Sequence, residues 1–390
     1  MRAIVVGAGI GGLTATLALR RAGHDVTLLE QSRRLTEIGA GIQLAPNATR
    51  VLRRLNLLDA VAQHSVRPAH LSFRTWSDGS EICRYVIGRD AEEEFGAPYL
   101  QVHRADLQQA LAAAVPPGSL RLATPVTGID QDDKAARVTT ASGERLDADL
   151  VVAADGIRSA ARQWLFGADE AVFSHTAAYR ALLPAAEVAD LDLPQYAGWL
   201  GPGGHVVHYW LRRGELLNVV AVFVTDRAAR ESWTAQAEPG EQLRTFAGWD
   251  PRLLTVLDRA GQVFRYGIHT RAPLPRWHVG RVTLLGDSAH AMVPFQAQGA
   301  AQAVMDAAVL GDCLTDARAD EVPEALDRYV RRRVPAATAV QAGSARAGHD
   351  YHLPDGPEAD ARNARLVALA AGNRFGPHAA AWPEDVVADR

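Results

Sequence analysis

The stretch AIVVGAGIGGLTATLALRRAGHDVTLLE, residues 3–30, decides the fold of this chain. Residues 3–6 form an apolar run that is typical of a short buried strand, and residues 13–22 have the apolar periodicity of a helix. Residues 26–29 form a second apolar strand, which ends at Glu30. A strand, a glycine-rich turn, a helix and a second strand within about 30 residues predict a βαβ unit, and hence an α/β fold with a parallel sheet.

The turn between the first strand and the helix carries Gly7, Gly9 and Gly12, which match G-x-G-x-x-G. The first glycine allows the turn, the second lets a pyrophosphate approach the backbone, and the third lets helix and strand pack closely. The pyrophosphate would lie at the positive end of the helix, and Glu30 is placed to accept hydrogen bonds from a ribose. The context favours a dinucleotide site over a ligand-free glycine turn, but the motif does not distinguish NAD from FAD.

Two later apolar strands also end in polar loops. Residues 149–154 are followed by Asp155 and Gly156, and residues 281–285 lead into Asp287. Ligands of open α/β sheets lie outside the carboxyl ends of the strands. We therefore expect both loops to border the same site as the glycine-rich turn.

The bulk composition limits the partners of the chain. It has 390 residues, of which 48% are hydrophobic and 22% charged, and its net charge is −4. This is ordinary for about two domains, and we expect no nucleic-acid partner. The two cysteines, Cys83 and Cys313, match no metal-ligand spacing, so we expect no metal site and a reducing, cytoplasmic location. No window of about 18 uncharged apolar residues occurs, so we expect no membrane span.

A different pattern occupies the regions between these strands. Residues 71–87 alternate around a turn at 78–79, and residues 205–211 and 216–223 read as two strands of a hairpin. We expect them to form a mixed or antiparallel sheet in a second, inserted domain. The chain from residue 323 onward is rich in Ala and Arg and is expected to be mostly helical.

Three motifs together resemble one enzyme family: GAGIGG with Glu30, AADGIRS at 153–159, and GDSAHAMVPFQAQGA at 286–300. The chain is similar to the single-component flavin-dependent aromatic hydroxylases, typified by p-hydroxybenzoate hydroxylase. Its sequence pattern most resembles that of the salicylate, 3-hydroxybenzoate and 6-hydroxynicotinate hydroxylases. The resemblance covers residues 1 to about 345. The expected architecture is a Rossmann-like FAD-binding domain with an inserted substrate domain and C-terminal helices. The expected segments are 1–70, 100–170 and 270–345 for the FAD-binding domain, 71–99 and 171–269 for the substrate domain, and 346–390 for a helical appendage.

The resemblance implies FAD as cofactor and NADH or NADPH as a transient electron donor. Asp287 would bind the ribityl chain or a ribose, and Arg104, in HRADL, would lie near the ribityl–pyrophosphate region. The helix that opens at Gly299 would face the flavin edge that becomes negative on reduction. Because only one G-x-G-x-x-G occurs, we expect no separate NAD(P) domain. The full set expected to bind FAD is Gly7, Gly9, Gly12, Glu30, Arg104, Asp155, Gly156, Asp287, Gly299 and Ala300.

The stretch GGHVVHYWLRRGE, residues 203–215, carries the first candidate substrate residues. In a strand His205 and Tyr209 share one face and His208 lies on the other. The related hydroxylases of hydroxybenzoates and hydroxypyridines place a histidine and a tyrosine with this spacing above the flavin, where they would assist deprotonation of a phenol. A purely structural role for both, or a pocket on the His208 side, is the alternative.

Other residues would complete the pocket. Gln298 precedes the flavin-facing glycine and is a third catalytic candidate. Gln43, Pro294 and Phe295 would line the pocket, and some salicylate-type relatives carry a histidine where Phe295 stands, which puts salicylate itself in doubt. A substrate carboxylate would need an arginine, and the sequence offers Arg74, Arg84 and Arg180 without choosing among them.

The resemblance implies a monooxygenase that uses NAD(P)H and O₂ to hydroxylate a small phenolic or hydroxylated heteroaromatic acid through a flavin C4a-hydroperoxide. We expect a monomer or homodimer whose partners are the small aromatic substrate and O₂. A hydroxylase of a larger natural product, a flavin reductase and a flavin-binding protein without turnover are alternatives. A halogenase is another, although none of the eight tryptophans makes the W-x-W that such enzymes usually show.

Overall fold

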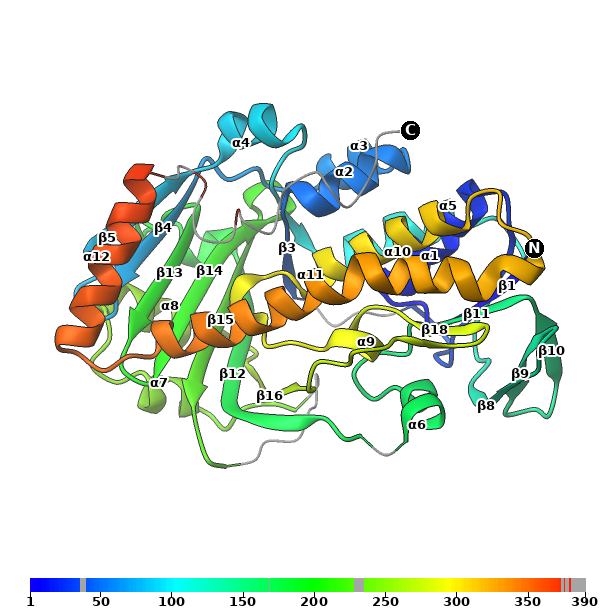
Figure 1. The fold of residues 1–390 in the computed structure, drawn as a ribbon. Coiled ribbons are helices and arrows are strands. Elements are labelled where there is room, and N and C mark those ends of the chain that lie inside the picture. Colours follow the sequence, from blue (N-terminus) through cyan, green and yellow to red (C-terminus); the bar gives the residue numbers. More distant parts are fainter. Residues whose placement is uncertain (36–39, 168, 228–234, 373–374, 376–378, 380–390) are drawn as a thin grey trace.

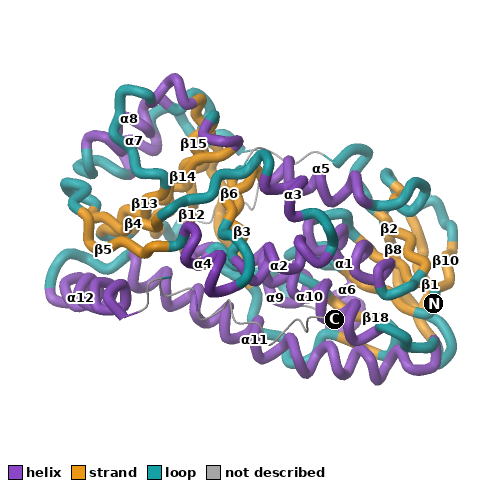
Figure 2. Tube along the Cα trace, turned by 90° about the horizontal axis from the view of Figure 1, so that it is seen from above, coloured by secondary structure: helices purple, strands orange, loops and turns teal. Residues whose placement is uncertain are grey.

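Two β-sheets lie side by side and divide the molecule into two lobes, and one long helix, α11 (Val322–Tyr351), spans both of them (Figures 1 and 2). The structure, a computed structural model, describes residues 1–35, 40–167, 169–227, 235–372, 375 and 379. The end of the expected appendage, residues 380–390, lies outside the described residues.

The first sheet has six strands in the order β17-β18-β11-β1-β2-β7. All neighbours in it are parallel except the edge strand β17. The predicted strands at 3–6 and 26–29 are β1 and β2, and α1 (Ile10–Arg21) connects them, so the βαβ unit is confirmed. The strand bounds are β1 Arg2–Val6, β2 Asp25–Leu29, β7 Leu120–Arg121, β11 Leu150–Ala153, β17 His278–Val279 and β18 Val282–Leu284.

This sheet is covered on both faces, which explains why its central strands are apolar throughout. On one face Val5 and Leu28 pack with α1, α5 (Arg104–Ala114) and α10 (Gly299–Leu314). On the other face Ile4 and Val151 pack against a three-stranded antiparallel sheet. That small sheet consists of β8 Val126–Gln131, β9 Ala136–Thr140 and β10 Arg145–Ala148.

The second lobe is a seven-stranded mixed sheet with the order β16-β12-β15-β14-β13-β4-β5. Every neighbouring pair is antiparallel except β13 and β4, which are parallel. The predicted hairpin is β14 and β15, and the alternating segment at 71–87 is β4 and β5. The bounds are β4 His70–Thr75, β5 Glu81–Val86, β12 Val172–Pro184, β13 Tyr196–Gly201, β14 Gly204–Leu211, β15 Leu216–Val224 and β16 Phe264–Thr270.

The two faces of the seven-stranded sheet have different neighbours. The inner face carries Val207 and Tyr209 and is covered by the end of α11, by the turn η3 (Pro294–Gln296) and by β3 (Gly41–Leu44), which pairs with β6 (Leu100–His103). The outer face carries Val206 and Trp199 and packs on α7 (Glu241–Thr245) and α8 (Pro251–Arg259). Alternation along each strand therefore sorts its side chains between two separate cores.

The remaining helices connect these parts. The helix α12 covers the β5 edge of the second sheet, where Tyr85 Oη donates to the Leu366 carbonyl at 3.1 Å. No helix in the described ranges is both long and apolar enough to cross a membrane. The other helices and turns are α2 Pro46–Arg54, α3 Leu58–Ala62, α4 Gly88–Phe95, α6 Ala160–Phe166, α9 Asp287–His290, α12 Pro357–Gly372, η1 Ala185–Val188, η2 Arg212–Gly214 and η4 Ala319–Glu321.

We propose that the FAD-binding domain and the substrate domain have the boundaries expected from the sequence. Each sheet takes its strands from one set of segments, with β4 and β16 beginning or ending within a residue of a boundary. The boundary between 345 and 346 falls inside α11, which continues to Tyr351.

The contact between α11 and η3 depends on a glycine. A Cβ at Gly348 would lie 2.5 Å from two ring carbons of Phe295. We expect Gly348→Ala to lower the free energy of unfolding by about 1–3 kcal/mol, because overpacking outweighs the gain in helix propensity. Denaturant unfolding of the purified protein measures this.

The matched control is Gly343→Ala in the same helix, whose Cβ would have the flexible amide end of Gln296 as its nearest neighbour, at 3.0 Å. That variant should be as stable as the parent or slightly more stable. Equal stability of the two variants would mean that the Phe295 ring is not held against α11.

Candidate functional site

The glycine-rich turn after β1 is built for close backbone contacts. Gly7 has φ +99°, and its amide donates to the Leu29 carbonyl at 2.7 Å. A Cβ at Gly12 would lie 1.8 Å from the Gly7 carbonyl oxygen, whereas a Cβ at Gly9 would meet nothing within 4 Å. Gly7 and Gly12 are thus required by the fold itself, and Gly9 keeps open the space in front of the N-terminus of α1. This open cradle at a helix N-terminus fits a pyrophosphate.

Glu30 lies beside this turn, at the end of β2. Its carboxylate accepts from the Ala8 amide at 2.7 Å and from the Ser32 amide at 2.8 Å, and the residue is half-exposed. The two backbone bonds hold the carboxylate in one orientation and leave acceptor capacity for a ribose hydroxyl.

The loop after β11 contains an acceptor that the protein does not use. Asp155 Oδ2 accepts from the Ala161 amide at 3.1 Å, but Oδ1 is buried and has no hydrogen-bond partner among the described residues. Burial raises the pKa of this carboxyl group. A buried carboxylate oxygen without a partner is unfavourable, and a ligand hydroxyl would satisfy it. Gly156 follows with φ +77° and no neighbour within 4 Å of a Cβ.

The loop after β18 brings Asp287 and the N-terminus of α10 to the same edge of the sheet. Asp287 is exposed and begins α9. Gly299 and Ala300 are half-exposed in the first turn of α10, whose 16 residues give it a substantial dipole. Arg104 begins α5, and its amide donates to the Ala40 carbonyl at 2.9 Å. The predicted FAD residues thus lie at the ends of strands and the starts of helices.

A buried ionic network supports this loop. Asp306, in the middle of α10, is fully buried and accepts from the Gly286 amide at 3.0 Å. Its two oxygens also contact His290 Nε2 and Arg333 Nε, both at 2.6 Å. Burial alone would raise the pKa of Asp306, but His290 and Arg333 outweigh it and hold the pKa at about 2. Sequence analysis missed this network, although a carboxylate inside an apolar helix was a visible signal.

Tyr209 lies on the inner face of the second sheet, among polar groups from other elements. Its ring stacks on Tyr196 with centroids 6.3 Å apart, and it lies against Gly41. The Gly41 amide donates to Asn218 Oδ1 at 2.8 Å. Burial raises the pKa of the Tyr209 phenol well above its usual range, so Tyr209 keeps its proton at neutral pH. Gln43 is also here, where it accepts from Tyr99 Oη at 2.5 Å.

His205 lies on the same face as Tyr209, as the alternation predicted. It is 3% exposed, and its ring packs edge-on against Phe295 with centroids 5.2 Å apart. Its Nδ1 is hydrogen-bonded to Nε2 of His352 at 2.7 Å. Burial, with a smaller contribution from His352, lowers the pKa of His205 well below its usual value. A neutral His205 is able to accept a proton.

His208 points to the outer face instead. Its Nδ1 accepts from Trp199 Nε1 at 3.1 Å, and its Nε2 lies 3.2 Å from the Pro194 carbonyl. Burial lowers the pKa of His208 to about 4. Both ring nitrogens of His208 are therefore used in hydrogen bonds within the protein, which argues against the alternative pocket on the His208 side.

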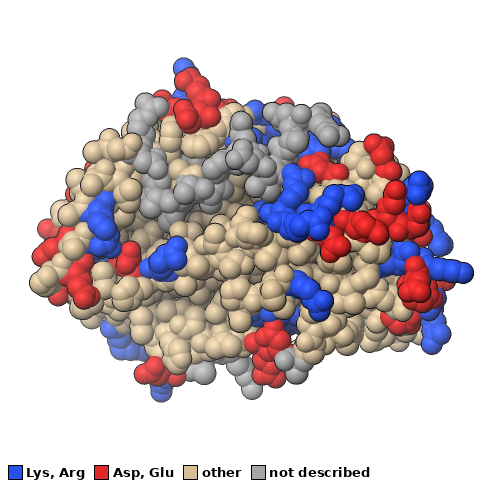
Figure 3. All heavy atoms as spheres, viewed as in Figure 1, with Lys and Arg blue, Asp and Glu red and all other residues tan. Residues whose placement is uncertain are grey.

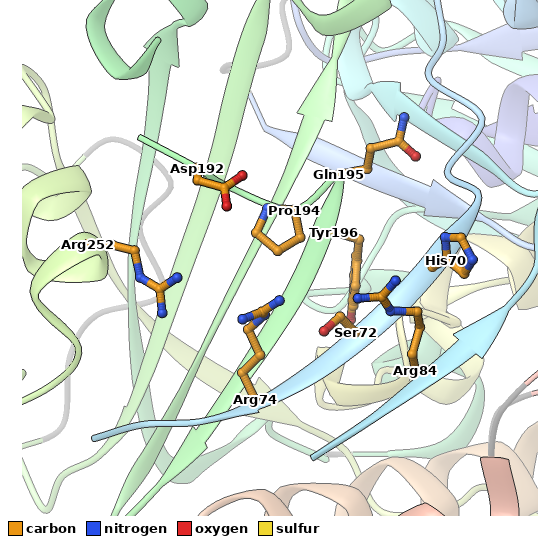
Figure 4. Close-up of a pocket in the computed structure, with 9 residues that line it drawn as sticks. All are labelled: His70, Ser72, Arg74, Arg84, Asp192, Pro194, Gln195, Tyr196 and Arg252. Carbon is orange, nitrogen blue, oxygen red and sulfur yellow. The ribbon is translucent and has the colours of Figure 1, made fainter. Parts of the chain in front are cut away.

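Two of the three candidate arginines share the outer face. Arg74 and Arg84 line a cavity of about 310 Å³ together with His70, Asp192 and Arg252 (Figure 4). Glu81 contacts both Arg74 and Arg84. The third candidate, Arg180, is 5% exposed and lies on the inner face, where its guanidinium is 4.8 Å from the Tyr266 ring centroid.

Gln298 and η3 come directly before α10. Gln298 is 3% exposed, and its Oε1 accepts from Asn47 Nδ2 at 3.0 Å. Pro294 and Phe295 form the turn before it, and Phe295 fits against Gly348 of α11.

On the face of the molecule shown in Figure 3, acidic and basic side chains are interspersed rather than separated into patches of one sign.

Comparisons with known proteins agree with this geometry. Residues 1–344 match the family model described as FAD binding domain. A 3-amino-4-hydroxybenzoate 2-monooxygenase of Streptomyces platensis is 39% identical over 92% of this chain and 90% of its own length. A 6-hydroxynicotinate 3-monooxygenase of Bordetella bronchiseptica is 33% identical over 90% of this chain and 91% of its own. The solved structure of Klebsiella pneumoniae HpxO with FAD and uric acid has a TM-score of 0.85 and 26% identity, and covers 97% of each chain.

The glycine turn gives a matched pair of variants. We expect Gly9→Ala to keep the apo-protein within about 1 kcal/mol of the parent, because Ala is only a poorer N-cap, yet to weaken FAD binding. Gly12→Ala should prevent normal folding, because its Cβ would overlap the Gly7 carbonyl. Thermal unfolding of apo-protein and titration with FAD separate the two effects, and unchanged FAD affinity in Gly9→Ala would contradict the assignment of the cradle.

The buried network predicts a strong coupling between two residues. Asp306→Asn and Arg333→Met should each cost about 3–5 kcal/mol of unfolding free energy, because each leaves a partner buried without its counter-charge. The double variant Asp306→Asn with Arg333→Met should lose less than the sum of the two single variants. Denaturant unfolding of the single and double variants tests this, and strict additivity would show that the two groups do not interact.

Proposed function

The chain belongs to the FAD-binding-domain family of flavin-dependent aromatic monooxygenases, and we propose from this premise that its substrate is a small phenolic or hydroxylated heteroaromatic acid. The observation that carries the proposal is the composition of the inner face, where a neutral histidine and a tyrosine on β14 and an arginine on β12 are buried on the two strands that flank β15. Such a set suits a ring that bears both a hydroxyl and an acid group.

FAD is the cofactor of this enzyme class, and NADH or NADPH supplies its electrons; when bound, FAD supplies the activation of O₂ and the transfer of an oxygen atom to the ring. The residues proposed to hold it are those of the three strand-end loops, with Glu30, Asp155 and Asp287 as acceptors for its hydroxyls. The first turn of α10, at Gly299 and Ala300, would favour negative charge beside it.

The protein's own part in the reaction begins with the substrate hydroxyl. We propose that His205 accepts the hydroxyl proton, because a ring with a negatively charged oxygen is the better nucleophile. Tyr209 stays protonated and orients the same oxygen by a hydrogen bond. Gln298, which accepts a hydrogen bond from Asn47, would contact the substrate ring. Pro294 and Phe295 would exclude water from the ring.

Arg180 is the arginine proposed to bind the acid group. It is buried on the inner face with Tyr209, whereas Arg74 and Arg84 lie in the outer-face cavity of Figure 4. A carboxylate that enters a buried site needs a charged hydrogen-bond donor to replace its water. The planar guanidinium of Arg180, stacked on Tyr266, is positioned to provide it.

We propose a reducing, cytoplasmic location for the protein. Cys83 and Cys313 are both buried free thiols, which supports a reducing, cytoplasmic location. We also propose that the protein is a monomer or homodimer. The modest net charge of −4 supports the absence of a nucleic-acid partner.

The test is anaerobic flavin reduction by NADH and by NADPH, with and without a panel of hydroxylated benzoates, hydroxylated pyridines and larger phenols. We expect one or more small acids to accelerate the loss of flavin absorbance by orders of magnitude. Acceleration only by the larger phenols, or equally fast reduction without any aromatic, would contradict the proposed substrate class.

The same assay tests Arg180. In Arg180→Gln the concentration of 3-hydroxybenzoate needed for half-maximal effect should rise about 10- to 100-fold, because a charged hydrogen bond is worth about 1.5–3 kcal/mol. The response to 3-hydroxybenzamide, which lacks the charge, should change little and serves as the control. An equal loss for both compounds would assign Arg180 a structural role.

A further inference from the structure

Two histidines from distant parts of the chain form a direct pair behind the proposed substrate site. His205 is on β14 and His352 follows the last residue of α11, 147 positions later. The distance from Nδ1 of His205 to Nε2 of His352 is 2.7 Å, and the ring centroids are 5.0 Å apart. In a hydrogen bond between two imidazoles one nitrogen donates and the other accepts. The pair therefore holds one shared proton between β14 and the end of α11.

The pair connects a buried position with an open one. His205 is buried, whereas His352 is half-exposed and borders a cavity of about 490 Å³. This cavity lies between the ends of β12, β15 and β16 on one side and η3 with α11 on the other; its polar lining includes Ser174, Thr176, Thr270 and His349. The cavity can hold water, and its residues can accept hydrogen bonds from it.

Few charged groups surround the pair. Tyr351 packs against His205 with ring centroids 5.4 Å apart, and Phe295 of η3 packs edge-on against the same ring. His349 is the other titratable group on the cavity side, and no Asp, Glu, Lys or Arg is among the described residues that line the cavity. Burial, with a smaller effect of His349, lowers the pKa of His352 to about 4. Both imidazoles are thus neutral at pH 7 and can pass a proton without retaining it.

We propose that His352 is a positioning residue that relays the proton of the substrate hydroxyl from His205 to water in this cavity. The inference rests on the proposed function, in which His205 receives that proton. The substrate O–H bond breaks and its proton binds Nε2 of His205. The proton on Nδ1 of His205 passes to Nε2 of His352, and the proton on Nδ1 of His352 passes to water. One proton leaves the substrate, one reaches the solvent, and both imidazoles remain neutral in the other tautomer.

The relay also returns to its starting state. One proton passed in the reverse direction, from water through His352 and His205 to the ring oxygen, restores both tautomers. The hydrogen of the ring carbon that gains the new hydroxyl leaves in the water formed by the reaction. Because the site itself must exclude water, a route through side chains separates proton exchange from solvent entry.

The test follows the absorbance of the phenolate form of one probe, 3-amino-4-hydroxybenzoate, after rapid mixing with the FAD-loaded protein. His352→Gln keeps the size and hydrogen bonding of the side chain but cannot relay a proton. His352→Ala opens a space beside the cavity that imidazole added to the buffer can fill. We expect both variants to form phenolate roughly 10²-fold or more slowly than the parent. Imidazole should restore His352→Ala and not His352→Gln.

His278→Gln is the control for the loss of one half-buried imidazole, since His278 pairs with Asp327 at a different part of α11; it should behave as the parent. Parental rates in the two His352 variants, or a slow His352→Ala that imidazole does not restore, would overturn the relay. His205→Gln separates this result from the proposed function. Slow phenolate formation in His205→Gln with parental rates in the His352 variants overturns only the relay, whereas parental rates in His205→Gln overturn the role of His205 as well.

Discussion

One buried carboxylate, that of Asp306, organises the end of the FAD-binding sheet. It contacts the Gly286 amide, His290 and Arg333, which come from the loop after β18, from α9 and from α11. A buried charge that loses its partners costs several kcal/mol, so these segments cannot move apart independently. The loop that carries Asp287 is therefore fixed against α10, and the helix N-terminus is held beside the strand-end acceptors that surround the proposed flavin site.

The second constraint is the two-residue period of the seven-stranded sheet. On β14, His205 and Tyr209 face the inner site while His208 is held in the outer core by Trp199. A shift of one residue in the pairing would exchange these roles. The same alternation places Arg180 on the inner face and Arg74 in the outer cavity. The side chains of the proposed site and those of the outer core are thus separated by strand geometry rather than by distance along the chain.

Local patterns explain how far sequence reasoning reached. The βαβ unit, the three strand-end loops and the hairpin at 205–223 were predictable because each follows from the periodicity and turn chemistry of adjacent residues. The alternation also predicted correctly that His205 and Tyr209 share a face. A choice among Arg74, Arg84 and Arg180 was not possible, because it depends on which strand each one pairs with.

Long-range partners could not be predicted from one sequence. His205 and His352 are 147 positions apart, and Asp306 meets Arg333 from the next helix. His352 lies just beyond the end of α11, which packs against η3 where Gly348 leaves space for Phe295. Periodicity indicates that a helix is buried, but it does not indicate which neighbour a polar group on that helix will meet.

The pairing of β4 with β13 has a consequence for the order in which the protein is made. The hairpin of β4 and β5 leaves the ribosome early, but its parallel neighbour begins only at Tyr196. In the other sheet, β1 can pair with β11 only after β11 has been synthesised, and β11 can pair with β18 only after the chain has reached Val282. Non-local pairing of this kind slows folding and leaves strand edges open during synthesis. Neither lobe is complete until most of the chain exists, so the folding of each lobe depends on segments that are made late.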